Sequence, residues 1–153
     1  LKNYGPEKVG DILVRSSKLK GIEIPRKYIA SAIDEFPILF IAAASASGKT
    51  ILKNAEELRY KESDRLSVMS KGLLKCNINS SLYDDGIEIN GGKISGATIN
   101  SYGDHRIAMA FAIAGLISKD PITILNTENV STSFPGFFSL IKDMGLKIKR
   151  ENI

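Results

Sequence analysis

The sequence predicts a mixed α/β fold in which apolar helices are covered by short strands. Two apolar segments, residues 38–46 and 107–117, have apolar residues on nearly all sides of a helix, so both helices are expected to be buried. Each segment is followed by the strand pattern Thr-Ile-Leu, at residues 50–52 and 123–125. Buried helices that alternate with short strands are typical of layered α/β domains.

The same pattern occurs twice along the chain, at a spacing of about 70 residues. Asp34 precedes the first apolar helix and Asp104 precedes the second, and the two Thr-Ile-Leu strands have nearly the same separation. We therefore expect one domain over residues 1–153, built from strand–helix–strand–helix–strand units near 31–90 and 98–150.

The remaining elements follow from periodicity and turn residues. Alternating apolar residues predict further strands at residues 11–15, 19–24 and 146–148. Asp85-Gly86 suits a tight turn and predicts a hairpin over residues 82–89. Apolar residues at helical spacing predict amphipathic helices over residues 62–75 and from Ser133 to Gly145.

The bulk composition fits one globular domain in a reducing compartment. The chain has 153 residues, of which 43% are hydrophobic and 25% charged, which are ordinary values for a domain with a buried core. The longest mostly apolar run, residues 36–46, is too short to span a bilayer. The single cysteine, Cys76, excludes an internal disulfide and favours a cytoplasmic location. Because the chain opens on Leu1, we expect a piece of a longer protein.

Nucleotide and nucleic-acid binding are both disfavoured. The net charge of +4 is mild, the basic residues are scattered, and no Trp is present to stack on bases. Ser47-Gly48-Lys49-Thr50 resembles the end of a phosphate-binding loop, but that loop needs a glycine where Ala43 stands. It must also follow a strand and open a helix, whereas here a helix precedes and a strand follows.

The helix starts carry basic residues that indicate a bound anion. Capping alone accounts for three of the polar residues there, namely Asp34, Asp104 and Ser133. Arg106 in its first turn, and Lys61 and Arg65 at the start of the second helix, oppose the helix dipole. Helix N-termini attract phosphate and carboxylate, so these basic residues favour an anion site.

Two further residues have both a structural and a functional interpretation. His105 is the only histidine, and a lone histidine is more often structural than catalytic. A metal site is not expected, because His105 has no Cys or His partner at ligand spacing. Glu62 is either one end of a surface ion pair or an acid–base group, and spacing leaves both open.

Six motifs resemble, in the same order, the 3-phosphoshikimate 1-carboxyvinyltransferase (EPSP synthase) family of the shikimate pathway. The motifs are IDEFP at 33–37, AxGxT at 46–50, ELRYKESDR at 57–65, DDG at 84–86, GDHRIAMA at 103–110 and SFP at 133–135. They extend over nearly the whole chain, and KESDR together with GDHR is highly specific.

The resemblance implies an inside-out α/β barrel of repeated βαβαββ units, a fold with two domains of three units each. This chain would supply a partial C-terminal domain of about two and a half units. In the family, two anionic substrates bind between the domains, where helix N-termini point into the cleft. The partners implied are therefore shikimate 3-phosphate, phosphoenolpyruvate and a missing N-terminal domain, with neither nucleic acid nor membrane.

The resemblance also implies a reaction and the residues that perform it. The enolpyruvyl group of phosphoenolpyruvate moves to the 5-hydroxyl of shikimate 3-phosphate by addition and elimination, with no metal or organic cofactor. By motif match, the catalytic residues are Asp34, which holds and deprotonates the 5-hydroxyl, and Glu62, which moves protons at the methylene carbon. The other substrate-binding residues are Lys61 for shikimate 3-phosphate, Arg65 and Arg106 for phosphoenolpyruvate, and His105 in the same pocket.

Some features lie outside the shared pattern. Many members of the family carry lysine where this chain has Thr132, so phosphate contacts and glyphosate sensitivity do not carry over at that position. Because the N-terminal domain supplies further substrate ligands, we expect the 153-residue chain alone to be inactive. The alternatives are a domain like UDP-N-acetylglucosamine 1-carboxyvinyltransferase and an inert phosphate-binding fragment.

Overall fold

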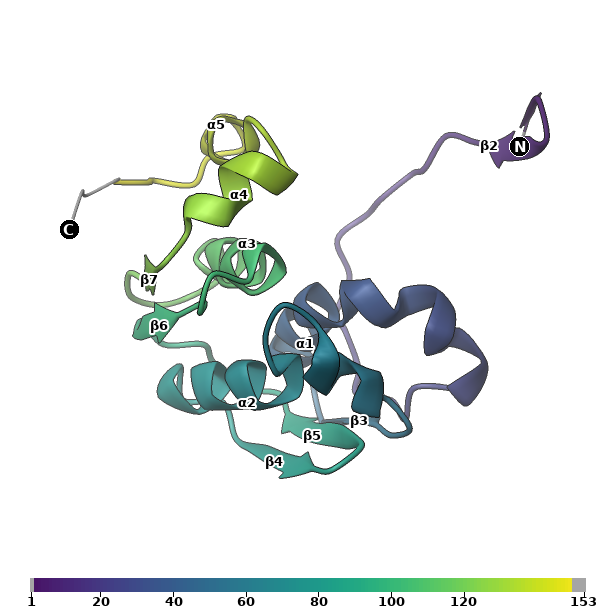
Figure 1. Ribbon diagram of the computed structural model, residues 1–153. Helices are drawn as coiled ribbons and strands as arrows, with labels where there is room; N and C mark the ends of the chain where they lie inside the picture. The colour runs from purple at the N-terminus through teal and green to yellow at the C-terminus, as the bar shows by residue number, and fades with distance from the viewer. Residues whose placement is uncertain (1, 150–153) are drawn as a thin grey trace.

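The computed structural model describes residues 2–149, which form a helical layer packed on small sheets, with an extended N-terminal arm (Figure 1). The strands are β1 Lys2–Tyr4, β2 Glu7–Val9, β3 Lys49–Leu52, β4 Ser80–Tyr83, β5 Gly86–Asn90, β6 Thr98–Asn100 and β7 Thr123–Leu125. The α-helices are α1 Phe36–Ser45, α2 Arg65–Lys75, α3 His105–Ala114, α4 Glu128–Ser133 and α5 Phe137–Asp143. Three 3-10 helices complete the described part, η1 Arg26–Tyr28, η2 Ala30–Glu35 and η3 Glu56–Tyr60.

The fold contains two parallel crossover units. Residues 20–24 run parallel to β3, with Gly21 N donating to Ser47 O at 2.8 Å, and α1 connects the two segments. In the second unit β6 pairs in parallel with β7, and α3 connects them. Gly21 is required in the first unit, because a Cβ there would lie 2.2 Å from the carbonyl oxygen of Lys49.

The first unit continues into a three-stranded antiparallel sheet of order β3-β5-β4. β4 and β5 form the predicted hairpin, in which Tyr83 pairs with Gly86 across the two-residue turn Asp84-Asp85. Thr50 pairs with Ile89, so the hairpin is held beside β3. This sheet covers α1 and α2, as Figure 1 shows at the lower end of the molecule.

The core lies where α1, α2 and α3 meet. Phe36 and Phe40 of α1, Leu66 and Met69 of α2 and Phe111 of α3 are all buried in one cluster. The opposite face of α3 packs against α4 and α5 in a second cluster, made of Ala108, Ala112, Val130, Phe137 and Ile141. α3 therefore lies between two hydrophobic cores, and its N-terminus is fixed on both sides.

Several predicted elements are confirmed. The apolar helices correspond to α1 and α3, although α3 ends at Ala114 rather than residue 117. The Thr-Ile-Leu patterns lie in β3 and β7, and the 82–89 hairpin is β4–β5. The strand predicted at 19–24 is present as two isolated parallel bridges, at Lys20 and Glu23.

Two predicted strands are wrong. Residues 11–15 form no strand, and Ile12, Leu13 and Val14 are 87%, 78% and 82% exposed. Residues 146–148 are also irregular, although Leu146 packs against the second core cluster. Alternating apolar residues make a segment suitable for a β-strand. A strand forms only when the backbone of a neighbouring strand is available for hydrogen bonding.

Helix starts were the least accurately predicted features. Asp34 does not cap α1, because η2 runs directly into the helix and the N-cap position is Glu35, with no side-chain bond. Ser133 ends α4 instead of opening α5, whose N-cap is Gly136 at φ +86°. α2 begins at Arg65 rather than Glu62, and Asp64 caps it by accepting from Ser67 N at 3.0 Å.

Within residues 2–149, no helix combines the length and the apolar character that crossing a bilayer would require.

Candidate functional site

Arg65 is the centre of a charged cluster. Its guanidinium donates from Nε to Asp104 Oδ2 at 2.9 Å, from Nη1 to Asp34 Oδ1 at 2.9 Å and from Nη2 to Glu62 Oε2 at 2.6 Å. The Arg65 and Asp104 side chains are 1% and 0% exposed, whereas those of Asp34 and Glu62 are 46% and 50% exposed. One side of the guanidinium is thus held inside the protein, and the other faces carboxylates that water reaches.

Asp104 fixes the inner side of this cluster. Its Oδ1 accepts from the backbone N–H groups of Arg106 at 3.0 Å and Ile107 at 3.4 Å, so it is the N-cap of α3. Its Oδ2 accepts from Ser63 Oγ at 3.0 Å as well as from Arg65. A single buried carboxylate therefore joins the start of α3 to the start of α2.

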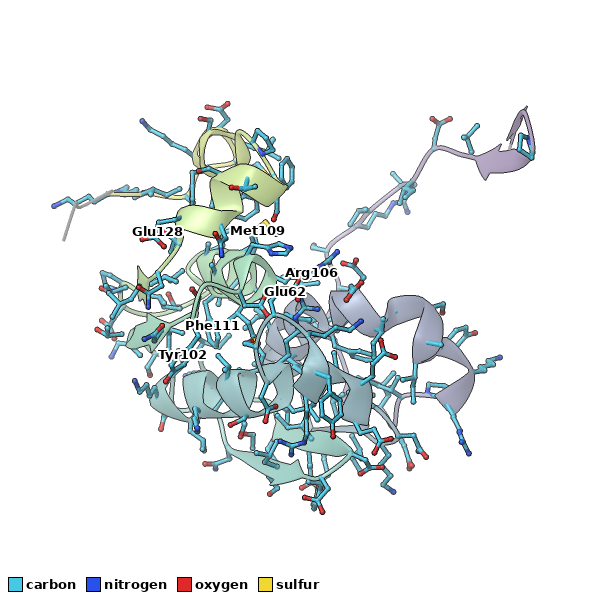
Figure 2. All side chains as sticks on the ribbon, in the orientation of Figure 1. Glu62, Tyr102, Arg106, Met109, Phe111 and Glu128 are labelled. Atoms are coloured by element: carbon cyan, nitrogen blue, oxygen red, sulfur yellow. The ribbon has the colours of Figure 1, made fainter. Side chains whose placement is uncertain are left out.

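Arg106 and Lys61 lie on the open side. Arg106 Nη1 donates to the backbone carbonyl of Asp34 at 2.9 Å and to Glu35 Oε1 at 3.0 Å. Lys61 Nζ lies 2.7 Å from Glu57 Oε1 and 3.6 Å from Asp34 Oδ1. Figure 2 shows Glu62 and Arg106 close together, at the place where α3 begins beside α1.

The surrounding cations set the pKa of Asp34. Desolvation alone would raise it, but the hydrogen bond from Arg65 and the charges of Lys61, Arg106 and Arg65 outweigh that and lower the pKa below its ordinary value. The hydrogen bond to Glu57 raises the pKa of Lys61, and Asp34 adds to this effect. At neutral pH Asp34 is therefore a carboxylate and Lys61 an ammonium.

The structure brings all six predicted site residues into one region. Asp34, Lys61, Glu62, Arg65 and Arg106 are connected by the contacts above. His105 is the first residue of α3 and is half-buried beside Asp104. Water reaches the outer carboxylates of the cluster, and two cavities of about 520 and 300 Å³ lie elsewhere and are lined by other residues.

The ion pair that was one of two interpretations of Glu62 is present, with Arg65 Nη2 at 2.6 Å. The other partners of the basic groups were not predicted: Asp104 was expected only to cap its helix, and no role was expected for Glu35, Glu57 or Ser63. Each basic residue at a helix start thus has a carboxylate partner within the chain. Such a partner explains a basic residue near a helix N-terminus without a bound anion. The GDHR motif contained a signal for Asp104. This aspartate directly precedes His105 and Arg106, two predicted site residues, so it had to lie at the site as well.

The structure also tests the two other kinds of site considered from the sequence, a phosphate-binding loop and a metal site. Gly48, at φ +86°, precedes strand β3 and not a helix, and Lys49 Nζ pairs with Glu88 Oε1 at 2.9 Å. Ser47-Gly48-Lys49-Thr50 therefore lacks the geometry of a phosphate-binding loop. In residues 2–149, no group of three His, Cys, Asp or Glu side chains is arranged to hold a metal ion.

Known proteins give a consistent picture. A relative from Legionella pneumophila (strain Paris), named 3-phosphoshikimate 1-carboxyvinyltransferase, is 52% identical over 146 residues, which cover 95% of this chain and 34% of the relative. A relative of the same name from Coxiella burnetii (strain RSA 493 / Nine Mile phase I) is 51% identical over 143 residues, 94% of this chain and 33% of its own length. The present chain spans about a third of the length of these proteins.

The fold agrees with these relatives. A solved EPSP synthase from Acinetobacter baumannii matches with a TM-score of 0.86 at 50% identity, over 88% of this chain and 32% of that one. A second structure of EPSP synthase from the same organism gives a TM-score of 0.83 at 47% identity. The sequence profile described as EPSP synthase (3-phosphoshikimate 1-carboxyvinyltransferase) matches residues 4–141, so the chain belongs to the EPSP synthase family.

Proposed function

We propose that this chain is the C-terminal portion of an enzyme that transfers the enolpyruvyl group of phosphoenolpyruvate to the 5-hydroxyl of shikimate 3-phosphate. The observation that carries the proposal is the convergence of the KESDR and GDHR motifs on one guanidinium, that of Arg65. The names of the relatives and the shared fold support the same activity. A metal or organic cofactor has no part in the proposed reaction.

Lys61 and Arg106 are the proposed anchors for the substrates' anionic groups. Their side chains are 22% and 31% exposed, so an anion can reach them from solvent. Their present partners, Glu57 and Glu35, are exposed carboxylates in ion pairs that are weak in water. A doubly charged phosphate competes effectively with such a partner, because it brings more charge and more acceptor oxygens.

Arg65 binds a substrate carboxylate by exchange. Asp104 holds Nε from the buried side, while the terminal nitrogens face Asp34 and Glu62. Replacement of these two by the single carboxylate of phosphoenolpyruvate leaves the guanidinium between two carboxylates, that of Asp104 and that of the substrate, and allows a bidentate geometry. The same exchange releases Asp34 and Glu62 for proton transfer. His105, at the first position of α3, is the proposed further residue of this substrate pocket.

The released carboxylates supply the acid–base chemistry. In the addition step Glu62, in its protonated form, gives its proton to the methylene carbon of phosphoenolpyruvate, the 5-hydroxyl oxygen bonds to the adjacent carbon, and Asp34 takes the hydroxyl proton. In the elimination step Glu62 takes a proton back from the new methyl group as the carbon–oxygen bond to phosphate breaks, and the departing phosphate takes the hydroxyl proton from Asp34. The positive charges that lower the Asp34 pKa weaken it as a base, and bound phosphate offsets them.

We also propose the family's architecture for the whole protein. The two parallel crossover units, through α1 and through α3, support repeats near residues 31–90 and 98–150 of an inside-out α/β barrel. The chain then forms a partial C-terminal domain of about two and a half units over residues 1–153. The one cysteine, which is buried and unpaired, supports a cytoplasmic location.

A chimera tests the proposed activity. This chain replaces the matching third of the Legionella pneumophila relative, and phosphate release from phosphoenolpyruvate is measured with and without shikimate 3-phosphate. We expect release only with both substrates, and none from the 153-residue chain alone. Glu62→Ala should reduce turnover by about 10² to 10⁴, whereas Glu56→Ala, an exposed glutamate of η3, should not.

Three results would contradict the proposal. A folded chimera that is silent while the parent relative is active would refute the assignment of this chain. Turnover with UDP-N-acetylglucosamine in place of shikimate 3-phosphate would favour the related enzyme class. Turnover by the 153-residue chain alone would show that no second domain is needed.

A further inference from the structure

Arg59 makes three directional contacts just before the segment that carries Lys61 and Glu62. It lies in η3, and its guanidinium donates from Nε to Asp84 O at 2.7 Å, from Nη2 to Tyr83 O at 2.7 Å and from Nη1 to Asp64 Oδ2 at 2.6 Å. The side chain is 23% exposed. Planar fork geometry allows one arginine to satisfy all three acceptors, which a lysine cannot do.

The contact with Asp64 closes a small ring of backbone. Arg59 and Asp64 flank residues 60–63, so their ion pair ties the two ends of this segment together. The segment contains Lys61 and Glu62, which give the cluster its cation and its acid–base group. Tyr60 is exposed, so packing into the core does not hold this end of the segment in place. Asp64 is also the N-cap of α2, and Arg65 follows it directly.

The contacts with Tyr83 and Asp84 attach this ring to the β4–β5 hairpin, because the two carbonyls lie at its turn. The turn is itself hydrogen-bonded to the residues that follow β3. Asn54 N donates to Asp85 Oδ2 at 2.8 Å, and Ala55 N donates to Asp85 O at 2.7 Å. Arg59 therefore links the hairpin, the residue 60–63 segment and the start of α2.

We infer that Arg59 is a positioning residue that sets the placement of Lys61 and Glu62 for the transfer reaction. The inference rests on the proposed function, since those two residues act in it. Arg59 touches none of the cluster's own groups in the contacts above, and it acts only through the backbone that carries them. Without Arg59, the segment stays attached to Leu58 and to α2, but the distance between its two ends is no longer fixed by the ion pair with Asp64.

The test uses Arg59→Ala and Arg59→Lys in the chimera, with Arg26→Lys as the matched control. Arg26 lies on the exposed η1, away from this network. We expect kcat to fall on the order of 10²-fold in both Arg59 variants, because a shift of about 1 Å in a reacting group costs that much. The KM for phosphoenolpyruvate should change less than threefold, and methylguanidinium should restore kcat of Arg59→Ala where an equal concentration of sodium chloride does not.

Asp64→Asn provides a second, milder perturbation. Asparagine caps a helix as well as aspartate does, so this variant weakens the ion pair with Arg59 and leaves the start of α2 intact. It should reduce kcat in the same direction and should add little to the effect of Arg59→Ala, because both act on one contact. A kcat within twofold of the unmodified chimera for Arg59→Ala, or full additivity of the two changes, would overturn the inference.

Backbone ¹⁵N relaxation in the 153-residue chain separates this inference from the proposed activity. Arg59→Ala should clearly lower the heteronuclear NOE of the Lys61 and Glu62 amides and leave amides in the middle of α1 and α3 unchanged. If the parent chimera is inactive, the proposed function fails, yet the relaxation result still decides whether Arg59 orders the segment. An unchanged heteronuclear NOE at Lys61 and Glu62 refutes the positioning role in either case.

Discussion

Replacement of Asp104 by asparagine isolates the charge of the buried carboxylate. Asparagine keeps the helix cap on α3 and nearly the same volume, so backbone N–H groups at the start of α3 retain an acceptor. What is lost is the negative charge beside Arg65, in a pair whose side chains are 1% and 0% exposed. Removal of one member of a buried pair costs about 3–5 kcal/mol, because the other charge stays buried without its partner.

Two other carboxylates moderate that cost. Asp34 and Glu62 still accept from the Arg65 guanidinium at 2.9 and 2.6 Å, so we expect the lower end of the range, about 3 kcal/mol. Urea unfolding of the 153-residue chain measures it: with an m-value of about 2 kcal/mol/M, the midpoint should drop by about 1.5 M. Asp84→Asn, in the exposed hairpin turn, is the control and should change the free energy of unfolding by less than about 0.5 kcal/mol.

A double-mutant cycle shows whether the loss comes from the pair. Arg65→Met together with Asp104→Asn removes both charges, so the double variant should be less destabilised than the sum of the two single ones. The reasoning is refuted if Asp104→Asn costs less than about 1 kcal/mol, or if the two changes are additive. Either result would mean that the Arg65 guanidinium does not depend on Asp104 in the folded chain.

Three further predictions concern the same cluster and the core. Because the folded-state pKa of Asp34 is lowered, its carboxylate stabilises the fold above the unfolded pKa of about 3.9 and loses that effect as pH falls through the folded value. Asp34→Asn should therefore be less stable than the parent at pH 7, and in urea titrations the difference should shrink as the pH falls below about 4 and vanish below the folded pKa. Millimolar phosphate should raise the Asp34 pKa in carboxyl-carbon NMR, because it offsets the charges of Lys61 and Arg106, and an unchanged pKa with phosphate bound would contradict the proposed anchors. Gly72→Ala should destabilise the chain by about 1–2 kcal/mol despite a helix-propensity gain of about 1 kcal/mol, because the new Cβ would lie 2.3 Å from Phe111 Cζ; Phe111→Leu in the same chain should recover part of the loss.

The local sequence pattern correctly predicted the helices and strands whose formation depends mainly on their own residues. α1 and α3 are apolar on nearly all sides and are found as buried helices, and β3 and β7 lie at the Thr-Ile-Leu patterns. The β4–β5 hairpin was predicted, although its turn lies at Asp84-Asp85, one residue before the predicted Asp85-Gly86, and Gly86 begins β5. These signals are contained within ten or so residues, so no distant contact was needed to interpret them.

Some of the failures involve distant partners. Residues 11–15 alternate like a strand, but within the described chain they have no strand beside them. Asp34 reads as a helix cap, yet its side chain is taken by Arg65, which is 31 positions away in sequence. For the site, motif resemblance named the six residues that the structure gathers, while their roles stay predictions. The carboxylates that neutralise the cluster could not be inferred from dipole arguments, because those consider one helix at a time.

The charged cluster joins the two crossover units. Asp34 and Asp104 occupy comparable places before α1 and α3, and only Asp104 caps its helix. Both nevertheless accept from the same guanidinium, since Arg65 Nη1 reaches Asp34 and Nε reaches Asp104. Arg106, from the second unit, returns the contact by donating to the backbone carbonyl of Asp34 in the first. A helix start can therefore give up its own cap when its aspartate is used to join two units. The charged groups of the cluster are, for this reason, also the groups that fix α1 and α3 to each other.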